Sequence, residues 1–139
     1  MSWAQSLIRI STYEVETLQK RFAEITDRVA AAKAIIAQLD VEAQLEAAAA
    51  ADASDLYAML AHASYARAWK ARREQAMGHL ALIEREMEGA RDALTAAFEE
   101  QKKYEHVAEI ARVAAVKAAN QRETATLDEL ALRRAAVGR

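Results

Sequence analysis

The chain has 139 residues and a formal net charge of −2, with 36 alanines, three glycines, no proline and no cysteine. Its length fits one domain, its small charge gives no global attraction for nucleic acid or anionic lipid, and the lack of cysteine excludes disulfides and thiol chemistry. An alanine-rich chain without proline suits long helices rather than a thick globular core. We therefore expect an all-α protein, with residues 1–139 forming a single coiled-coil domain.

Neither a secretion signal nor a membrane span is expected. The opening MSWAQSLIRISTYEVE lacks a basic segment followed by an apolar one. No stretch approaches the roughly 18 apolar residues that a membrane-spanning helix needs. The absence of cysteine is compatible with the cytosol. We expect a cytoplasmic protein with no direct membrane insertion.

The first expected element is a helix over about residues 2–50. Its apolar residues alternate steps of three and four, which is the spacing of a coiled-coil seam. This first seam consists of Val15, Leu18, Phe22, Ile25, Val29, Ala32, Ile36, Leu39 and Ala43.

A reversal of the chain is expected at about residues 51–54, because a second seam further on is out of phase with the first. Asp52 and Ser54 are favourable N-cap residues, and Asp52 with Asp55 resembles a capping box. The pattern leaves one alternative open, an unbroken rod that dimerises through both seams. The expected fold is two long helices in an antiparallel coiled-coil hairpin.

The second expected helix covers about residues 54–134 and is the longer of the two. Antiparallel pairing from the turn matches Leu39 with the region of Trp69, and Val15 with Met87–Ala90. Beyond Tyr104 this pairing leaves the second helix without a partner, as a C-terminal arm. The second seam consists of Ala66, Trp69, Arg73, Ala76, Leu80, Ile83, Met87, Ala90, Leu94, Ala97, Gln101, Tyr104, Ala108 and Ala111.

No residues form a pattern typical of catalysis, so we expect no enzyme and no cofactor. Asp128 and Glu129 are adjacent and would point about 100° apart on a helix, without a pocket to perturb their pKa values. Glu129 and Arg133 have the spacing of a solvated helical pair. Thr126 with Glu129 also fits a capping box that would restart a helix. The three histidines show no metal-ligand spacing; they are His62, His79 and His106.

The segment YARAWKARR, residues 65–73, combines aromatic and basic side chains. Aromatic rings flanked by basic groups can stack on single-stranded RNA. The acidic total and the absence of an RNA-binding fold signature favour a structural reading instead. We expect Trp69 to pack on Ile36 or Leu39, and Tyr65 to flank the seam and be exposed.

The closing stretch AAVKAANQRETATLDELALRRAA resembles the flagellar export protein FliJ family. That resemblance implies a non-enzymatic stalk of the flagellar type III export apparatus, similar to the γ-subunit stalk of rotary ATPases. The implied partners are a hexameric export ATPase (FliI-like), the export gate protein (FlhA-like) and export chaperones, with no nucleic acid. The implied location is the cytoplasmic face of the flagellar basal body.

The same resemblance implies two partner-binding regions. The second helix just past the turn would contact the gate, through Tyr65, Trp69 and Arg72. The C-terminal end would engage the ATPase, through Arg122, Asp128, Glu129, Arg133 and Arg134. Three other functions stay open: the equivalent stalk of a virulence secretion system, a homodimeric coiled-coil scaffold, and an RNA-binding coiled coil.

Overall fold

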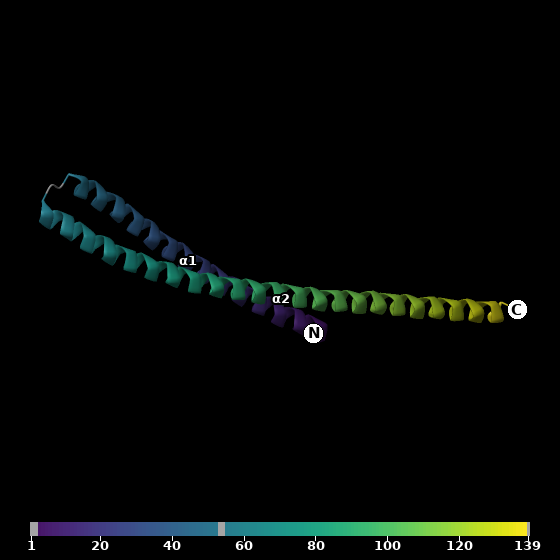
Figure 1. Cartoon of the computed structure of the whole chain (residues 1–139). Coiled ribbons are helices and arrows are strands. Elements are labelled where there is room, and N and C mark those ends of the chain that lie inside the picture. Colours follow the sequence, from purple (N-terminus) through teal and green to yellow (C-terminus); the bar gives the residue numbers. More distant parts are fainter. Residues whose placement is uncertain (1–2, 53–54, 139) are drawn as a thin grey trace. The chain divides into compact units, whose positions relative to one another are not determined.

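The computed structural model describes residues 3–52 and 55–138 and contains two α-helices (Figure 1). Helix α1 spans Trp3–Ala51 and helix α2 spans Leu56–Val137. The described residues contain no strand. The two helices pack against each other, which confirms the predicted all-α helical hairpin. Within the described ranges, neither helix is long and apolar enough to cross a membrane.

Helix α2 begins with Asp55 as its N-cap residue. The backbone N–H of Tyr57 donates a hydrogen bond to Asp55 Oδ1 (3.1 Å), and Met59 N–H donates to the Asp55 carbonyl oxygen (3.1 Å). The first bond satisfies an N–H group that a helix start leaves free, and the second is the first i→i−4 bond of the helix. The predicted cap at Asp52 was therefore placed too early, because Asp52 lies in the turn that ends α1. Ser54, the other predicted cap, lies outside the described residues.

The contacts within the chain form two units, which are described separately. The turn unit is Glu16–Thr95, and the terminal unit joins the residues up to Val15 with those from Ala96 onward. In the turn unit, buried residues from both helices form one apolar cluster, with Phe22, Ala76 and Met87 packed against it. The members of this cluster are Ile25, Val29, Ala32, Ile36, Leu80, Ile83 and Ala90.

Both predicted seams are confirmed in the turn unit, with one exception. Every predicted seam residue of α1 from Leu18 to Ala43 is buried or half-buried, as are those of α2 from Trp69 to Leu94. Ala66 is exposed, however, and Tyr65 is half-buried in its place. The seam of α2 thus steps by four residues twice, from Tyr65 to Trp69 and from Trp69 to Arg73. Such a stutter locally unwinds a coiled coil.

Ion pairs between α1 and α2 indicate the register of the turn unit. Arg73 Nε lies 2.9 Å from Asp40 Oδ1, and Arg28 Nη2 lies 3.1 Å from Glu86 Oε2. Residue numbers rise along α1 as they fall along α2 across these pairs, so the helices run antiparallel. Leu39 faces Trp69 as predicted, since the indole Nε1 donates to the Leu39 carbonyl oxygen (2.6 Å).

The terminal unit pairs the start of α1 with α2 residues from Ala96 onward. Gln101 Nε2 donates a hydrogen bond to Thr12 Oγ1 (2.9 Å). An antiparallel helix pair aligned at these residues places Val15 near Phe98, so the predicted match of Val15 with Met87–Ala90 was wrong. The buried residues of this unit are Ala4, Ser11, Val15 and Ala97; the Ser11 hydroxyl donates to the Ile8 carbonyl oxygen (2.9 Å).

Pairing in the terminal unit extends further along α2 than predicted. Trp3 and Ile8 line an open groove together with Ala108 and Arg112, beyond the predicted limit at Tyr104. Ala111 is exposed although it was assigned to the seam. Every residue from Glu109 to Gly138 is exposed. We call residues 113–137, which lie beyond this groove, the arm.

Candidate partner-binding surfaces

The aromatic and basic segment after the turn is partly absorbed by the hairpin itself. Trp69 is half-buried and, as expected, contacts Leu39, to whose carbonyl oxygen its indole N–H donates a hydrogen bond. The Arg73 guanidinium lies 5.9 Å from the centre of the Trp69 ring. Tyr65 is half-buried as well, which corrects the prediction that it is exposed. Arg72 is exposed and lies 3.6 Å from Glu42 of α1.

Arg73 joins the Trp69 ring to an acidic side chain of α1. Its Nε and Nη2 atoms approach the two carboxylate oxygens of Asp40 at 2.9 and 3.5 Å. This hydrogen bonding and the negative charge of Asp40 raise the pKa of Arg73 above its usual value. An open groove runs over this contact, lined by Asp40, Ala66, Trp69, Lys70, Arg73, Glu74 and Met77. Of the predicted gate residues, only Trp69 lines it.

The arm is one uninterrupted helix. The predicted restart at Thr126 was wrong, because α2 continues through this point to Val137. The Thr126 hydroxyl does not cap a new helix; it donates to the Arg122 carbonyl oxygen one turn earlier (2.9 Å). This back-bond is a usual way for threonine to satisfy its hydroxyl inside a helix.

The five predicted ATPase-binding residues do not share one face of the arm. At 100° per residue, Arg122, Glu129 and Arg133 fall within about 40° of one another. Arg133 Nη2 lies 3.0 Å from Glu129 Oε1, so the predicted solvated pair is confirmed. Asp128 and Arg134 lie roughly 120° to either side of Arg122. The structure therefore divides the predicted site among three faces.

A stripe of large apolar residues on the arm escaped the sequence analysis. If the heptad spacing of the second seam is continued past Ala111 into the arm, it reaches the face of Arg122 and Glu129. The larger residues instead lie roughly 120° round the helix from that face. Its apolar members are Val113, Val116, Leu127, Leu130 and Val137, all exposed. The available signal was their spacing of 3, 11, 3 and 7 residues, each a sum of helical steps of three and four.

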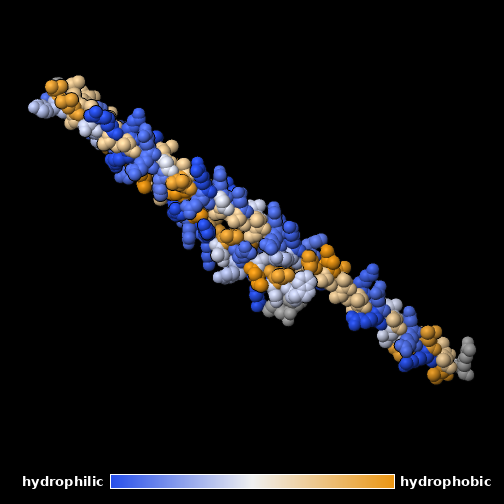
Figure 2. Space-filling view, turned by 60° about the horizontal axis from the view of Figure 1, so that its bottom comes forward, coloured by the Kyte–Doolittle hydropathy of each residue, from blue (hydrophilic) through white to orange (hydrophobic). Residues whose placement is uncertain are grey.

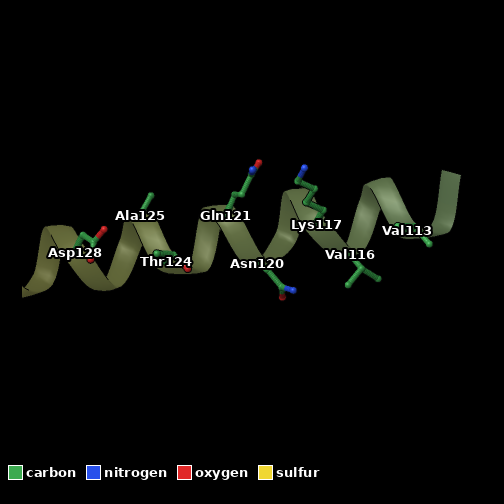
Figure 3. Close-up of a pocket in the computed structure, with 8 residues that line it drawn as sticks. All are labelled: Val113, Val116, Lys117, Asn120, Gln121, Thr124, Ala125 and Asp128. Atoms are coloured by element: carbon green, nitrogen blue, oxygen red, sulfur yellow. The ribbon is translucent and has the colours of Figure 1, made fainter. Parts of the chain in front are cut away.

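A second surface of the arm is lined mainly by polar and small residues, together with Val113 and Val116 of the apolar stripe (Figure 3). Lys117, Gln121 and Ala125 point to one side of the helix, and Val116 and Asn120 point to the other (Figure 3). All of the lining residues belong to one helix and are exposed, so this is an open surface and not an enclosed pocket. Asp128 lies at its end and is exposed.

The described residues contain no group of histidine and acidic side chains that could hold a metal ion. His62 lies 3.8 Å from Glu46 across the turn unit. The other two histidines, His79 and His106, are exposed on α2.

These features define a class of protein: an all-α antiparallel coiled-coil hairpin that continues into an exposed helical arm. A sequence model of one protein family, described as "Flagellar FliJ protein", matches residues 4–139. A relative named "Flagellar FliJ protein" from Caulobacter vibrioides strain NA1000 / CB15N is 51% identical over 137 residues, covering 98% of this chain and 96% of its own length. The protein of the same name from strain ATCC 19089 / CIP 103742 / CB 15 shows the same identity and coverage. The chain belongs to the flagellar FliJ family. No solved structure matches it.

Proposed function

We propose that this chain is a non-enzymatic stalk of the flagellar type III export apparatus. In this role the protein acts at the cytoplasmic face of the basal body, where it couples an export ATPase hexamer to the export gate. It also assists the delivery of substrates by export chaperones. Membership of the flagellar family supports the setting. The observation that carries the mechanical role is the arm, a helix of exposed residues that continues from the paired part of α2.

The arm is suited to binding inside or beneath a ring of subunits. A single helix that meets several identical subunits contacts them unequally, and unequal contacts bias their conformations. Arg122 and Arg133 offer planar guanidinium groups to acidic side chains on such a ring. Glu129 holds Arg133 on the same face through their 3.0 Å contact. We assign ATPase binding first to the face of Arg122, Glu129 and Arg133, with Asp128 and Arg134 at its sides.

Deletion of residues 121–139 tests this assignment. The deletion should leave the hairpin folded, because the buried residues of both units lie before it. It should abolish stimulation of the export ATPase, measured by phosphate release. The double variant Arg122→Glu/Arg133→Glu tests the assigned face directly and should also reduce stimulation. The control is Lys117→Glu/Lys102→Glu, which reverses two charges elsewhere on α2 and should not reduce it. Equal stimulation by the truncated and intact chains would exclude the arm as the docking element.

Contact with the export gate is assigned to the segment of Tyr65, Trp69 and Arg72. Tyr65 and Trp69 are only partly covered by α1, and Arg72 is exposed. Tyr65→Ala should reduce swimming while helicity, measured by circular dichroism, stays unchanged. Tyr65→Phe is the control, since it keeps the ring and removes only the hydroxyl. Wild-type swimming by Tyr65→Ala would remove this segment from the gate contact.

The alternatives receive less support. The 51% identity to flagellar relatives favours the flagellar system over a virulence system. Both seams of the turn unit are buried within one chain, so dimerisation through those seams is not needed to cover them. A net charge of −2 gives no general attraction for RNA. Co-purification of an ATPase from the native cell would separate the stalk from a scaffold.

A further inference from the structure

Six residues near the end of the arm lie on one stripe of the helix surface. At 100° per residue they span about 100°. Leu127 and Leu130 form the centre of the stripe and are 60% and 51% exposed. Figure 2 shows hydrophobic side chains in separate patches near the C-terminal end, with hydrophilic ones between. In order, the stripe consists of Asn120, Glu123, Leu127, Leu130, Arg134 and Val137.

The order of residues in this stripe is symmetric about its centre. Glu123 stands four residues before Leu127, and Arg134 stands four residues after Leu130. Neither charged side chain forms an ion pair with any described residue. When two copies of the stripe are laid antiparallel, Leu127 of each copy meets Leu130 of the other. Glu123 of each copy then meets Arg134 of the other, so one alignment covers the leucines and pairs all four charges.

We propose that the arm binds the arm of a second copy of this chain as an antiparallel helix pair. The interface is isologous, with the same stripe used by both copies. The residues beside the stripe include Thr124, Thr126 and Ala131, which are small enough to let two helices approach closely, and Arg133, which is paired with Glu129 of its own helix. Asp128 and Glu129 lie on the outer faces, so their like charges stay apart.

Other alignments of two copies are worse on the same grounds. A parallel pair sets Glu123 against Glu123 and Arg134 against Arg134 of the second copy, which is repulsive. An antiparallel pair shifted by one heptad sets Glu123 against Leu127. The helix is already formed in each chain, so association does not need to nucleate it. The paired segment, residues 120–137, is about 27 Å long, which fits a weak and reversible dimer.

Charge reversals in the full chain test the pairing without reference to any export component. Glu123→Arg places arginine against arginine, and Arg134→Glu places glutamate against glutamate. Each single variant should weaken dimerisation at least roughly tenfold in sedimentation velocity. The double variant Glu123→Arg/Arg134→Glu should dimerise as the unchanged protein does, because it restores both pairs with reversed polarity. An equimolar mixture of the two single variants should form a heterodimer for the same reason.

Two further results decide the proposal. Leu127→Ser with Leu130→Ser should abolish dimerisation, whereas Leu45→Ser with Leu60→Ser, exposed leucines of the turn unit, should not change it.

Because the chain has no cysteine, Asn120→Cys and Val137→Cys variants report only the new contact. Mixed together they should cross-link as a heterodimer, and Asn120→Cys alone should not cross-link. The proposal is overturned by a monomer at the highest soluble concentration, by single reversals that dimerise normally, or by self-cross-linking through residue 120. A monomer whose stripe binds a helix of another protein counts among these contrary outcomes.

Discussion

The turn unit and the arm carry the same kind of sequence pattern with opposite outcomes. In both, large apolar residues keep to one face of a helix rich in alanine, at steps of three and four in the turn unit and at steps of 3, 11, 3 and 7 in the arm. In the turn unit this pattern is buried, with Ile25 and Ile83 each 3% exposed, whereas in the arm Leu127 is 60% exposed. Such spacing therefore makes a helix amphipathic, but it does not decide whether a partner covers the apolar face.

The difference also separates the sources of stability in the two regions. Helix packing stabilises the turn unit through the burial of branched apolar side chains. The arm depends on helix propensity, on continuity with the paired part of α2 and on local pairs such as Arg133 with Glu129. A mutation of one residue type should consequently have a large effect in a seam and a small one on an exposed face.

The largest effect is expected from truncating a buried seam residue. Ile25→Ala should destabilise the protein by about 2–5 kcal/mol, because the lost methylene groups leave a cavity among Val29, Ile83 and their neighbours. Ile35→Ala is the matched control on the same helix, since Ile35 is 51% exposed. Urea unfolding followed by circular dichroism measures both. Equal destabilisation of the two variants would show that the seam of α1 is wrongly placed.

Most of the fold could be predicted from the sequence because helix periodicity is a local property. The seam of α1 and most of the seam of α2 follow directly from the spacing of apolar residues. Ala66 was assigned to the seam because a regular heptad was continued past Trp69. The helix instead has a stutter at Trp69, next to the contact of Arg73 with Asp40, and Tyr65 rather than Ala66 lies at the interface.

The register of the hairpin and the faces of the arm were harder to predict. Alanine-rich seams pack in several registers with similar burial, so polar contacts such as that of Thr12 with Gln101 decide between them. Near Val113 the apolar residues move to a different face of α2. A regular heptad continued from the second seam stays on the original face and therefore misses them. The candidate binding residues were chosen by charge and resemblance, and charge alone does not say which of them share a face.

A smaller effect is expected from Trp69→Phe in the turn unit. The variant keeps an aromatic ring in the seam but removes the indole donor to the Leu39 carbonyl oxygen. We expect a loss of about 1 kcal/mol, the usual net contribution of one hydrogen bond. Tyr57→Phe, at an 81% exposed position, should change stability little. Thermal and urea unfolding measure both variants. If Trp69→Phe loses no more stability than Tyr57→Phe, the indole N–H has no structural role.

A still smaller effect on stability is expected from Glu129→Lys in the arm. It replaces an exposed pair with Arg133 by a repulsion, and exposed pairs contribute well under about 1 kcal/mol. Helicity and the urea midpoint should therefore be nearly unchanged, while ATPase stimulation should fall because Arg133 loses the group that holds it in place. A variant that unfolds the chain would mean that the arm is packed against another segment.

The smallest expected effect is a pH dependence near the start of the arm. Arg112 contacts Glu109 at 2.6 and 2.9 Å, and its hydrogen bonds and charge hold the pKa of Glu109 below its usual value. A carboxylate with a lowered pKa in the folded state contributes stability that is present above its unfolded pKa and is lost as the pH falls through its folded pKa. Local helicity around Glu109 should thus be constant near neutral pH and decrease only below the usual range for glutamate. Glu109→Gln should show reduced helicity at neutral pH and no such acid-induced step, and Arg112→Gln should lose the step as well, because Arg112 is the group that lowers the folded-state pKa of Glu109. Circular dichroism titrations of the three proteins measure these differences. An acid-induced step that stays at the same pH in Arg112→Gln would show that this ion pair does not control the helix at the boundary between the paired residues and the arm.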